Sequence, residues 1–460
     1  MSLIIPANTL ASGGYEVANS LRFNDDSSDY LNRTPASAGD RNTWTYSVWI
    51  KRGNLGSGTS PAFTILSGDT TSDYGDIFRL REDKFNFRNY SNSTNYYFSD
   101  RKYRDTSAWY NFIIKYDGAN STVQLYVNGE LEGSVSISLN ENSTINDDEP
   151  QIIGAWQSSS PNNYFDGYMA EAVMIDGQAL DPTSFGEFDE DSGIWKPIDV
   201  SGLTFGTNGF YLDFEDSGAL GADVSGNTNN FTVNNLTAID QTTDTCTNNF
   251  ATWNPLWSQS NGNIGDVVFS EGNLKTTTSA NYRTFPATIG FSSGKWYWEI
   301  KRYEDTADMH TGVMSELATP ANTATWIGST NNGWVFGCDG GSTYGDGVEG
   351  NTGYTAAPNA GDIVQVAFNA DDGKIYFGVN GTWQNSGNPA TGTNPAYTGL
   401  DTSLFYFPCA STGSDVEANF GSPSFAISSG NTDGNGYGNF EYAVPSGYYS
   451  LNTKNLSEYG

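Results

Sequence analysis

Hydrophobic and polar residues alternate in short runs along most of the chain, which is the pattern of strands with one buried face. In Thr43–Lys51, for example, Trp44, Tyr46, Val48 and Ile50 fall on one side of an extended strand. The same period of two predicts further strands at Ala62–Leu66, Asp76–Arg81, Lys84–Arg88, Trp109–Tyr116, Thr122–Val127, Glu130–Ser136, Gln151–Gly154 and Tyr168–Ile175. This part of the chain is therefore expected to be a β-structure.

Two local signals complete the pattern in this half of the chain. Asn128-Gly129 separates two alternating runs and predicts a type I′ hairpin, because both turn residues must take positive φ. Helical periodicity is nearly absent. Only Asp181–Phe188, with Pro182 at its first helical position, predicts a short helical turn.

The segment from about Lys196 to Phe250 differs, because Gly, Asn and Asp replace the long apolar runs. Phe210, Leu212 and Phe214 still alternate, so we expect an ordered connector with one packed strand rather than a floppy linker. Alternating aromatic strands resume at Gly294–Ile300, Gly361–Phe368 and Lys374–Val379, and these predict a second β-domain.

Composition supports a folded, turn-rich, all-β protein of several domains. The chain has 460 residues, of which 14% are aromatic, 16% are charged and 52 are Gly. With 21 Lys and Arg against 53 Asp and Glu, the net charge is −32. Such a surface repels phosphate backbones and anionic membranes, so we expect no nucleic acid as a partner and favour cations or neutral glycans. An acidic, Lys-poor surface also suits salty media.

Residue counts exclude several kinds of chemistry within one chain. A single histidine, His310, cannot form a His dyad or a multi-His zinc site. Cys246, Cys338 and Cys409 are far apart and form no CxxC, so we expect inert thiols. The start, MSLIIPANTL, lacks a basic segment and has only a short apolar run, which predicts no secretory signal and synthesis in a cytoplasm. No apolar stretch approaches 18 residues, so no membrane insertion is expected.

The first β-region resembles laminin-G-like, concanavalin A-like jelly-roll sandwiches. The resemblance rests on the Val127-Asn128-Gly129 hairpin after a strand, and on the later run Phe165-Asp166-Gly167-Tyr168-Met169-Ala170-Glu171. It implies a two-sheet sandwich and carries little information on function, because many functions share this fold.

The second β-region resembles SPRY domains, which are also concanavalin A-like sandwiches and serve as binding modules. The matching segments follow in the family's order: Gly294–Ile300, Gly361–Phe368, the Asn380-Gly381 hairpin, Tyr406–Ala410 and Asn419–Gly421. The aspartate that closes the second motif is displaced to Asp371. The predicted fold is thus two tandem concanavalin A-like jelly-roll β-sandwiches, with an arm at 1–20, sandwiches at 21–195 and 251–460, and an irregular connector at 196–250.

The combination resembles virion surface proteins of tailed bacteriophages, particularly those of marine hosts. The start IIPANTL…GGYEVANSLRF, the Asp/Asn/Gly-rich connector and the closing PSGYYSLNTKNL carry this resemblance. It implies a protein that is made in the host cytoplasm and exposed on the virion as a tail fibre, appendage or capsid-bound adhesin. Its implied partners are other virion proteins, further copies of itself and a host-surface glycan or protein.

Aromatic residues in loop-like surroundings are the candidates for ligand binding, since glycan recognition needs a flat aromatic face beside polar groups. Packing inside the domains is the alternative role for each of them. The candidates are Trp156, Tyr164, Trp326, Trp334, Tyr344 and Trp383.

Acidic loops are candidates for calcium, although none matches an EF-hand and solvated turns are the alternative. No cofactor is required by any motif. The candidate calcium ligands are Asp69, Asp73, Asp76, Asp213, Asp216 and Asp223.

Hydrolysis is a weaker hypothesis, because glucanases of this fold place alternate carboxylates on one strand. The closest runs, Glu299–Asp305 and Glu187–Asp191, do not have that phase. We therefore expect a non-enzymatic adhesin, with a purely structural capsid decoration as the main alternative. Ile4, Ile5, Pro6 and Leu10 are the candidates for anchoring the chain to the particle, unless they form an edge strand.

Overall fold

The computed structural model is all-β, and its antiparallel sheets form two sandwich domains. It describes residues 14–55, 62–68, 75–91, 93–156, 160–257, 267–278, 283–304, 308–318, 326–329, 332–413 and 415–460. The described chain divides into two compact units, with the boundary between Thr247 and Asn248. Each unit is one sandwich and is described by itself.

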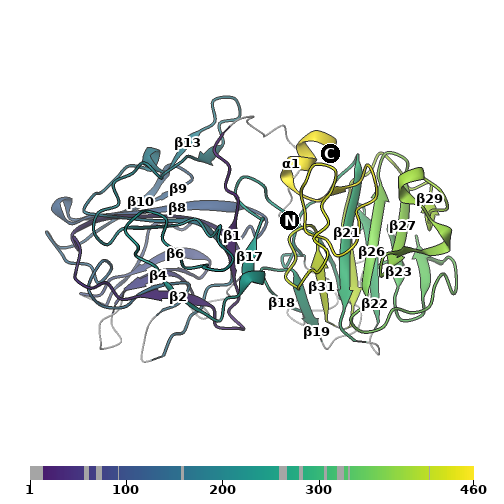
Figure 1. The fold of residues 1–460 in the computed structure, drawn as a ribbon, viewed down its shortest axis with the longest axis horizontal. Coiled ribbons are helices and arrows are strands. Elements are labelled where there is room, and N and C mark those ends of the chain that lie inside the picture. The colour runs from purple at the N-terminus through teal and green to yellow at the C-terminus, as the bar shows by residue number, and fades with distance from the viewer. Residues whose placement is uncertain are drawn as a thin grey trace. The chain divides into compact units, whose positions relative to one another are not determined.

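The first sandwich packs an eight-stranded sheet on a seven-stranded one (Figure 1). The eight-stranded sheet runs β10-β9-β8-β3-β12-β1-β17, and β15 also pairs with β12. Its strands are β1 (Ser20–Phe23), β3 (Thr43–Arg52), β8 (Trp109–Asp117), β9 (Thr122–Val127), β10 (Glu130–Ser136), β12 (Gly167–Asp176), β15 (Phe210–Leu212) and β17 (Gln241–Thr242).

The seven-stranded sheet runs β16-β2-β11-β4-β5-β6-β7. Its strands are β2 (Tyr30–Arg33), β4 (Phe63–Gly68), β5 (Asp76–Arg81), β6 (Lys84–Arg88), β7 (Asn95–Tyr97), β11 (Gln151–Ile153) and β16 (Thr232–Asn234). A separate hairpin joins β13 (Gly186–Phe188) to β14 (Trp195–Pro197).

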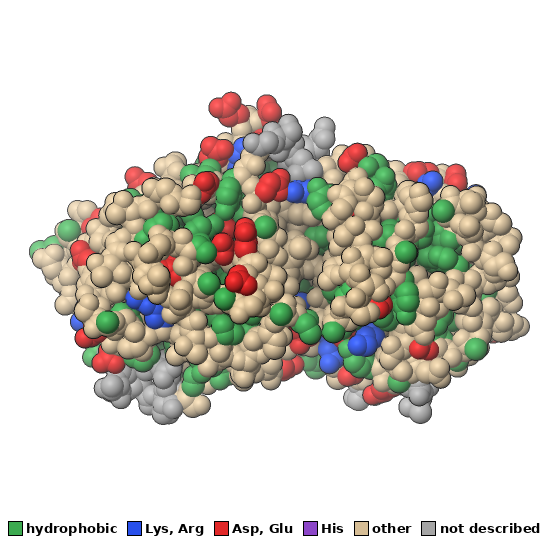
Figure 2. All heavy atoms as spheres, viewed as in Figure 1, with side chains coloured by type: hydrophobic (Ala, Val, Ile, Leu, Met, Phe, Trp, Pro, Cys, Tyr) green, Lys and Arg blue, Asp and Glu red, His purple; other side chains and the backbone are tan. Residues whose placement is uncertain are grey.

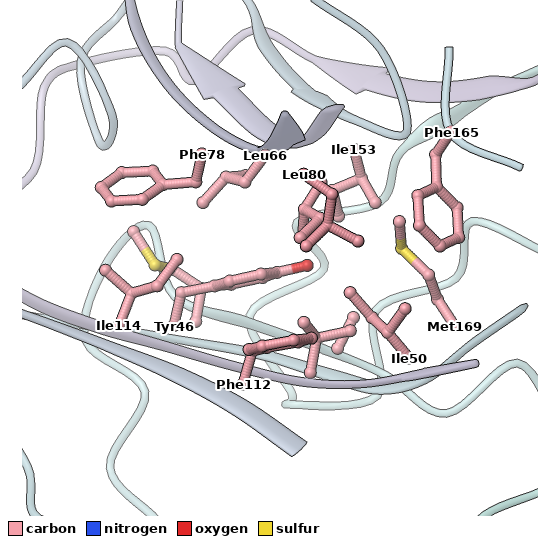
Figure 3. Close-up of a cluster of buried hydrophobic side chains, with 14 of the residues drawn as sticks. Tyr46, Ile50, Leu66, Phe78, Leu80, Phe112, Ile114, Ile153, Phe165 and Met169 are labelled. Atoms are coloured by element: carbon pink, nitrogen blue, oxygen red, sulfur yellow. The ribbon is translucent and has the colours of Figure 1, made fainter. Parts of the chain in front are cut away.

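The alternation predicted for β3 is confirmed. Trp44, Tyr46, Val48 and Ile50 all lie in the core between the two sheets, whereas Trp49 belongs to a second cluster on the other side of the strand. Figure 3 shows Tyr46 and Ile50 facing residues of the opposite sheet. Full burial of a large apolar side chain contributes about 1.5–3 kcal/mol, so this face holds the sandwich together.

The two local signals are also confirmed. Asn128 and Gly129 have φ of 49° and 81° and join β9 to β10, as a type I′ turn requires. The helical turn is η2 (Pro182–Ser184), a 3-10 helix with Pro182 in its first turn. It is shorter than the predicted segment because β13 begins at Gly186.

The connector differs from the sequence-based expectation. Residues 196–247 belong to the first unit, and three strands from this range join its sheets: β15 pairs with β12, β16 with β2 and β17 with β1. Phe210 and Leu212, two of the three alternating residues, form the strand β15, and both lie in the first core. These strands are three residues or fewer, which is why their periodicity is weak in the sequence.

The second sandwich pairs a nine-stranded sheet with a six-stranded one. The larger sheet runs β18-β19-β31-β21-β26-β27-β28, with β29 on β27 and β32 parallel to β21. Its strands are β18 (Val267–Ser270), β19 (Lys275–Thr278), β21 (Lys295–Arg302), β26 (Ile363–Asn369), β27 (Lys374–Val379), β28 (Thr382–Trp383), β29 (Tyr397–Thr398), β31 (Val416–Asn419) and β32 (Tyr449–Ser450).

The smaller sheet runs β20-β30-β22-β23-β24-β25. Its strands are β20 (Arg283–Pro286), β22 (Met309–Ser315), β23 (Gly333–Gly337), β24 (Ser342–Gly345), β25 (Val348–Glu349) and β30 (Tyr406–Thr412). The chain ends in α1 (Thr453–Tyr459), a helix that the sequence analysis missed although Asn452 is a good N-cap and its side chain accepts the N–H of Asn455.

Candidate binding surfaces

Two of the predicted ligand-binding aromatics lie beside the seven-stranded sheet of the first sandwich. Trp156 follows β11, and the guanidinium of Arg88 lies 5.9 Å from the centroid of its ring. Tyr164 packs against Tyr30 of β2, with ring centroids 6.2 Å apart. Trp156 and Tyr164 are both half-buried, so each keeps some surface that a ligand can contact.

Two more of these aromatics come together in the second sandwich. Trp326 stacks on the ring of His310 at 4.3 Å between centroids, and Tyr344 meets Trp326 edge-on at 4.7 Å. Burial lowers the pKa of His310 below its ordinary value, so the ring is held in its neutral form. Trp326 and Tyr344 are half-buried. The group forms a rigid aromatic face on the six-stranded sheet.

The last two candidates lie in strands and not in loops. Trp334 is in β23 and packs against Tyr406 with centroids 5.9 Å apart, on the side of the second core. Trp383 is in the short β28 and meets Tyr297 edge-on at 6.3 Å. Both have packing partners, which is the structural role that the sequence analysis left open for them.

The acidic candidates do not form a cation site in the described part of the chain. There, no group of three or more His, Cys, Asp or Glu side chains could hold a metal ion. Asp223 accepts the N–H groups of Tyr211, Ser225 and Asn229. Asp213 and Asp216 each accept one N–H two residues further on. These carboxylates therefore close turns of the backbone.

Asp76 is fully buried and also has a structural role. Its carboxylate accepts the hydroxyl of Ser143 and the N–H groups of Thr144 and Tyr90. Burial raises its pKa to about 6 although these donors oppose the shift. Its companions in the prediction, Asp69 and Asp73, lie outside the described residues, as do the anchoring candidates Ile4, Ile5, Pro6 and Leu10.

The glutamate that ends the laminin-G-like motif, Glu171, is buried on β12. The hydroxyl of Tyr211 donates to its carboxylate at 2.7 Å and that of Tyr15 at 3.3 Å. Glu171 also has φ of 51°, at a break in the β12–β3 register. Burial raises its pKa to about 7. The side chain thus joins the N-terminal segment and β15 to the sheet.

The glutamate of the SPRY-like motif, Glu299, is fully buried on β21. Its two carboxylate oxygens accept the backbone N–H groups of Glu441 and Tyr442 at 3.0 and 2.8 Å. Tyr297 and Asn419 donate to it as well. Burial raises its pKa to about 7 against these donors. Glu299 therefore fixes the C-terminal extension, residues 421–460, onto the nine-stranded sheet.

In the two runs considered for hydrolysis, several carboxylates already have partners. Glu299 is saturated with donors, and Asp305 lies outside the described residues. Glu187 and Asp189 both reach the ammonium of Lys196 at 3.3 Å. The role of the two motif glutamates could be suspected from their place in apolar strands, but the partners Tyr211 and Glu441 lie 40 and 142 residues away in the chain.

The charge of the surface agrees with the acidic composition. Figure 2 shows acidic side chains scattered over one face of the molecule, with few basic ones among them. Among the described residues, no helix is long and apolar enough to cross a membrane.

Comparison with known proteins identifies both domains. Residues 25–184 match the concanavalin A-like lectin/glucanases superfamily, and residues 295–423 match the SPRY domain family. The protein thus contains a laminin-G/concanavalin A-like domain followed by a SPRY domain, as the sequence motifs predicted. No curated protein matches the chain in sequence.

Solved structures resemble parts of the chain at low identity. The SPRY domain of human HERC1 is 18% identical, covers 36% of this chain and 96% of its own, and has a TM-score of 0.29. A candidate carbohydrate-binding protein from Bacteroides ovatus is 18% identical over 48% of this chain and 59% of its own, with a TM-score of 0.36. A heptameric pentraxin from Limulus polyphemus is 16% identical over 36% and 80%, with a TM-score of 0.30. At these values the likenesses say nothing about a ligand.

Proposed function

We propose that this protein is a non-catalytic attachment protein of a bacteriophage virion, which binds a glycan or protein on the host surface. The phage assignment rests on the start, connector and closing motifs of the sequence. The SPRY domain, together with a domain of the concanavalin A-like lectin/glucanases superfamily, supports the binding role. The virion setting implies synthesis in the host cytoplasm, attachment to other virion proteins and a symmetric homo-oligomer.

We infer the absence of catalysis from the burial and the hydrogen bonds of the two motif glutamates. A glycosidase needs two carboxyl groups that flank the scissile bond and reach the substrate. Glu171 and Glu299 are buried, and each is held by donors of its own domain. They hold segments of their own domains and are not available to a substrate, so binding without cleavage is the activity that fits.

The half-buried aromatics supply surfaces of the kind that binding needs. Trp156 and Tyr164 lie at one sheet of the first domain, and Trp326 and Tyr344 at one sheet of the second. A flat ring offers sugar C–H groups a large contact area at a low cost in conformational entropy. No cofactor is part of this proposal.

The experiment is retention of the purified full chain on a panel of bacterial surface polysaccharides, with the mass of each polysaccharide followed over time. We expect saturable retention with the polysaccharide mass unchanged. A falling mass would contradict the absence of catalysis. No retention on any polysaccharide or envelope protein extract would contradict attachment and favour a capsid decoration protein.

A further inference from the structure

The outer faces of the four sheets, meaning the faces turned away from the two cores, are not alike. Three are covered by apolar clusters. Trp49, Ile113 and Val173 lie under Phe185 and Trp195 on the eight-stranded sheet. Tyr297 and Tyr376 lie with Phe440 on the nine-stranded sheet, and Met314 and Val335 with Trp257 on the six-stranded sheet. The outer face of the seven-stranded sheet differs from these three in the chemistry of its side chains.

That face is cationic and polar, apart from Ile77 and Ile152. Directly opposite residues of neighbouring strands share a face. The register therefore aligns Thr64, Arg79, Asn86 and Tyr97 across β4, β5, β6 and β7. Arg88 is opposite Ile77, and Arg81 is opposite Lys84. The β5–β6 hairpin thus places Arg79, Arg81, Lys84 and Arg88 on one side, in a chain with 21 basic residues. Arg79 is buried, and Lys84 is paired with Asp100.

Arg79 is oriented by two side-chain amides. Arg79 donates from Nε to the side-chain oxygen of Asn86 at 3.0 Å and from a terminal nitrogen to that of Asn95 at 2.9 Å. It forms no ion pair among the described residues, and neither does Arg81. Burial, together with the charges of Arg81 and Arg88, lowers the pKa of Arg79 to about 10. An anion beside guanidinium groups that repel one another would stabilise them.

Two buried polar atoms beside the cluster point to the same conclusion. Thr64 is fully buried next to Arg79, and its hydroxyl has no hydrogen-bond partner in the described structure. The indole nitrogen of Trp156, whose ring lies against Arg88, is buried and has none among these residues either. Buried polar groups are almost always satisfied, so two unpaired donors beside one cluster point to a ligand oxygen, which would reach them by displacing the groups that cover them.

We propose that the outer face of the seven-stranded sheet binds an acidic saccharide, with Arg81 and Arg88 holding its anionic groups and Trp156 contacting its ring. This inference rests on the proposed function, and it names the ligand class and the domain that binds it. It reverses one expectation drawn from the net charge of −32, namely that ligands are cationic or neutral.

The chemistry fits both carboxylate and sulfate groups. The planar guanidinium donates two parallel N–H groups to either anion. A neutral sugar has no anionic group that can pair with a guanidinium. Uronic acid and sulfated sugars therefore share the recognition chemistry, and the experiment separates them.

The test is titration calorimetry of the full chain with polygalacturonate, with dextran sulfate and with neutral dextran of matched length. We expect binding of at least one acidic polymer and at least tenfold weaker binding of neutral dextran. Binding of polygalacturonate alone assigns a carboxylate ligand, and binding of dextran sulfate alone assigns a sulfate ligand.

Variants locate the site. Arg81→Gln and Arg88→Gln remove half-buried charges, and each should weaken acidic-polymer binding about tenfold, the effect of losing one charge-assisted hydrogen bond. Lys115→Gln is the matched control, because it removes one charge from β8 in the other sheet of the same domain. It should change the affinity less than twofold. A thermal melt confirms that each variant is folded.

The outcomes separate the two proposals. Equal losses of affinity in Lys115→Gln and the arginine variants would show that binding depends only on the total charge, and would contradict the proposed site. Unchanged binding in Arg81→Gln and Arg88→Gln, or binding of neutral dextran alone, would also overturn it while attachment stands. If none of the three polymers binds, the site is overturned, and attachment is then decided by the polysaccharide panel.

Discussion

Each sandwich buries its motif glutamate on the outer face of a central strand, but the two glutamates have different donors. In the first, the hydroxyls of Tyr211 and Tyr15 donate to Glu171. In the second, Glu299 receives the backbone N–H groups of Glu441 and Tyr442, one on each oxygen. Glu171 holds the N-terminal segment and β15, and Glu299 holds part of the C-terminal extension.

The two kinds of donor respond differently when an amide replaces the carboxylate. A hydroxyl rotates and can accept as well as donate, whereas a backbone N–H can only donate. The first sandwich should therefore tolerate an amide in place of its carboxylate, and the second should not. The comparison separates the effect of buried charge from the effect of hydrogen-bond polarity.

The largest expected effect is on the pH dependence of the first sandwich. Glu171 has a pKa of about 7 in the folded protein, against an ordinary 4.5, so its contribution to stability is complete below pH 4.5 and is lost as the pH rises to about 7. Glu171→Gln should match the wild type at pH 5 and exceed it by up to about 3 kcal/mol at pH 8.

The free energy of unfolding is read from hydrogen exchange of β12 peptides in increasing urea. A constant difference between Glu171→Gln and the wild type from pH 5 to pH 8 would contradict the buried titration. Hydrogen exchange of β21 peptides serves as the internal control, because β21 belongs to the second sandwich and Glu171 to the first.

A smaller loss is expected for Glu299→Gln at pH 5, where Glu299 is protonated in the wild type. One backbone N–H, of Glu441 or Tyr442, would then face an NH₂ group, which costs about 2 kcal/mol. Hydrogen exchange of the backbone amides in residues 421–452 should become faster as this stability is lost. Glu171→Gln at the same pH should cost less than about 0.5 kcal/mol, and equal losses in the two variants would refute the contrast between donors.

The smallest effect is expected for Trp383→Ala. Trp383 is half-buried and pairs edge-on with Tyr297, so its loss should destabilise the second sandwich by about 1 kcal/mol. Retention on acidic polysaccharide should not change, because the proposed site is in the first domain. A stable variant with lost retention would return Trp383 to the list of ligand-binding residues.

Much of the fold could be predicted from the sequence, because long alternating strands such as β3 and β5 carry a strong period of two. The short strands β15 to β17 could not, since three residues hold too little of that period. The candidate site shows the same limit. Trp156 and Tyr164 were recognised as aromatic loop residues, but Arg79 and Arg88 were not, because only the β5–β6 register places them on one face.

The most direct test of the central claim is labelling of arginine side chains by phenylglyoxal, located by mass spectrometry, with and without bound polygalacturonate or dextran sulfate. The account predicts that the ligand slows labelling of Arg81 and Arg88, while Arg101, whose side chain is 51% exposed in the same domain, labels at an unchanged rate. Unchanged labelling of Arg81 and Arg88 at saturating ligand would contradict it.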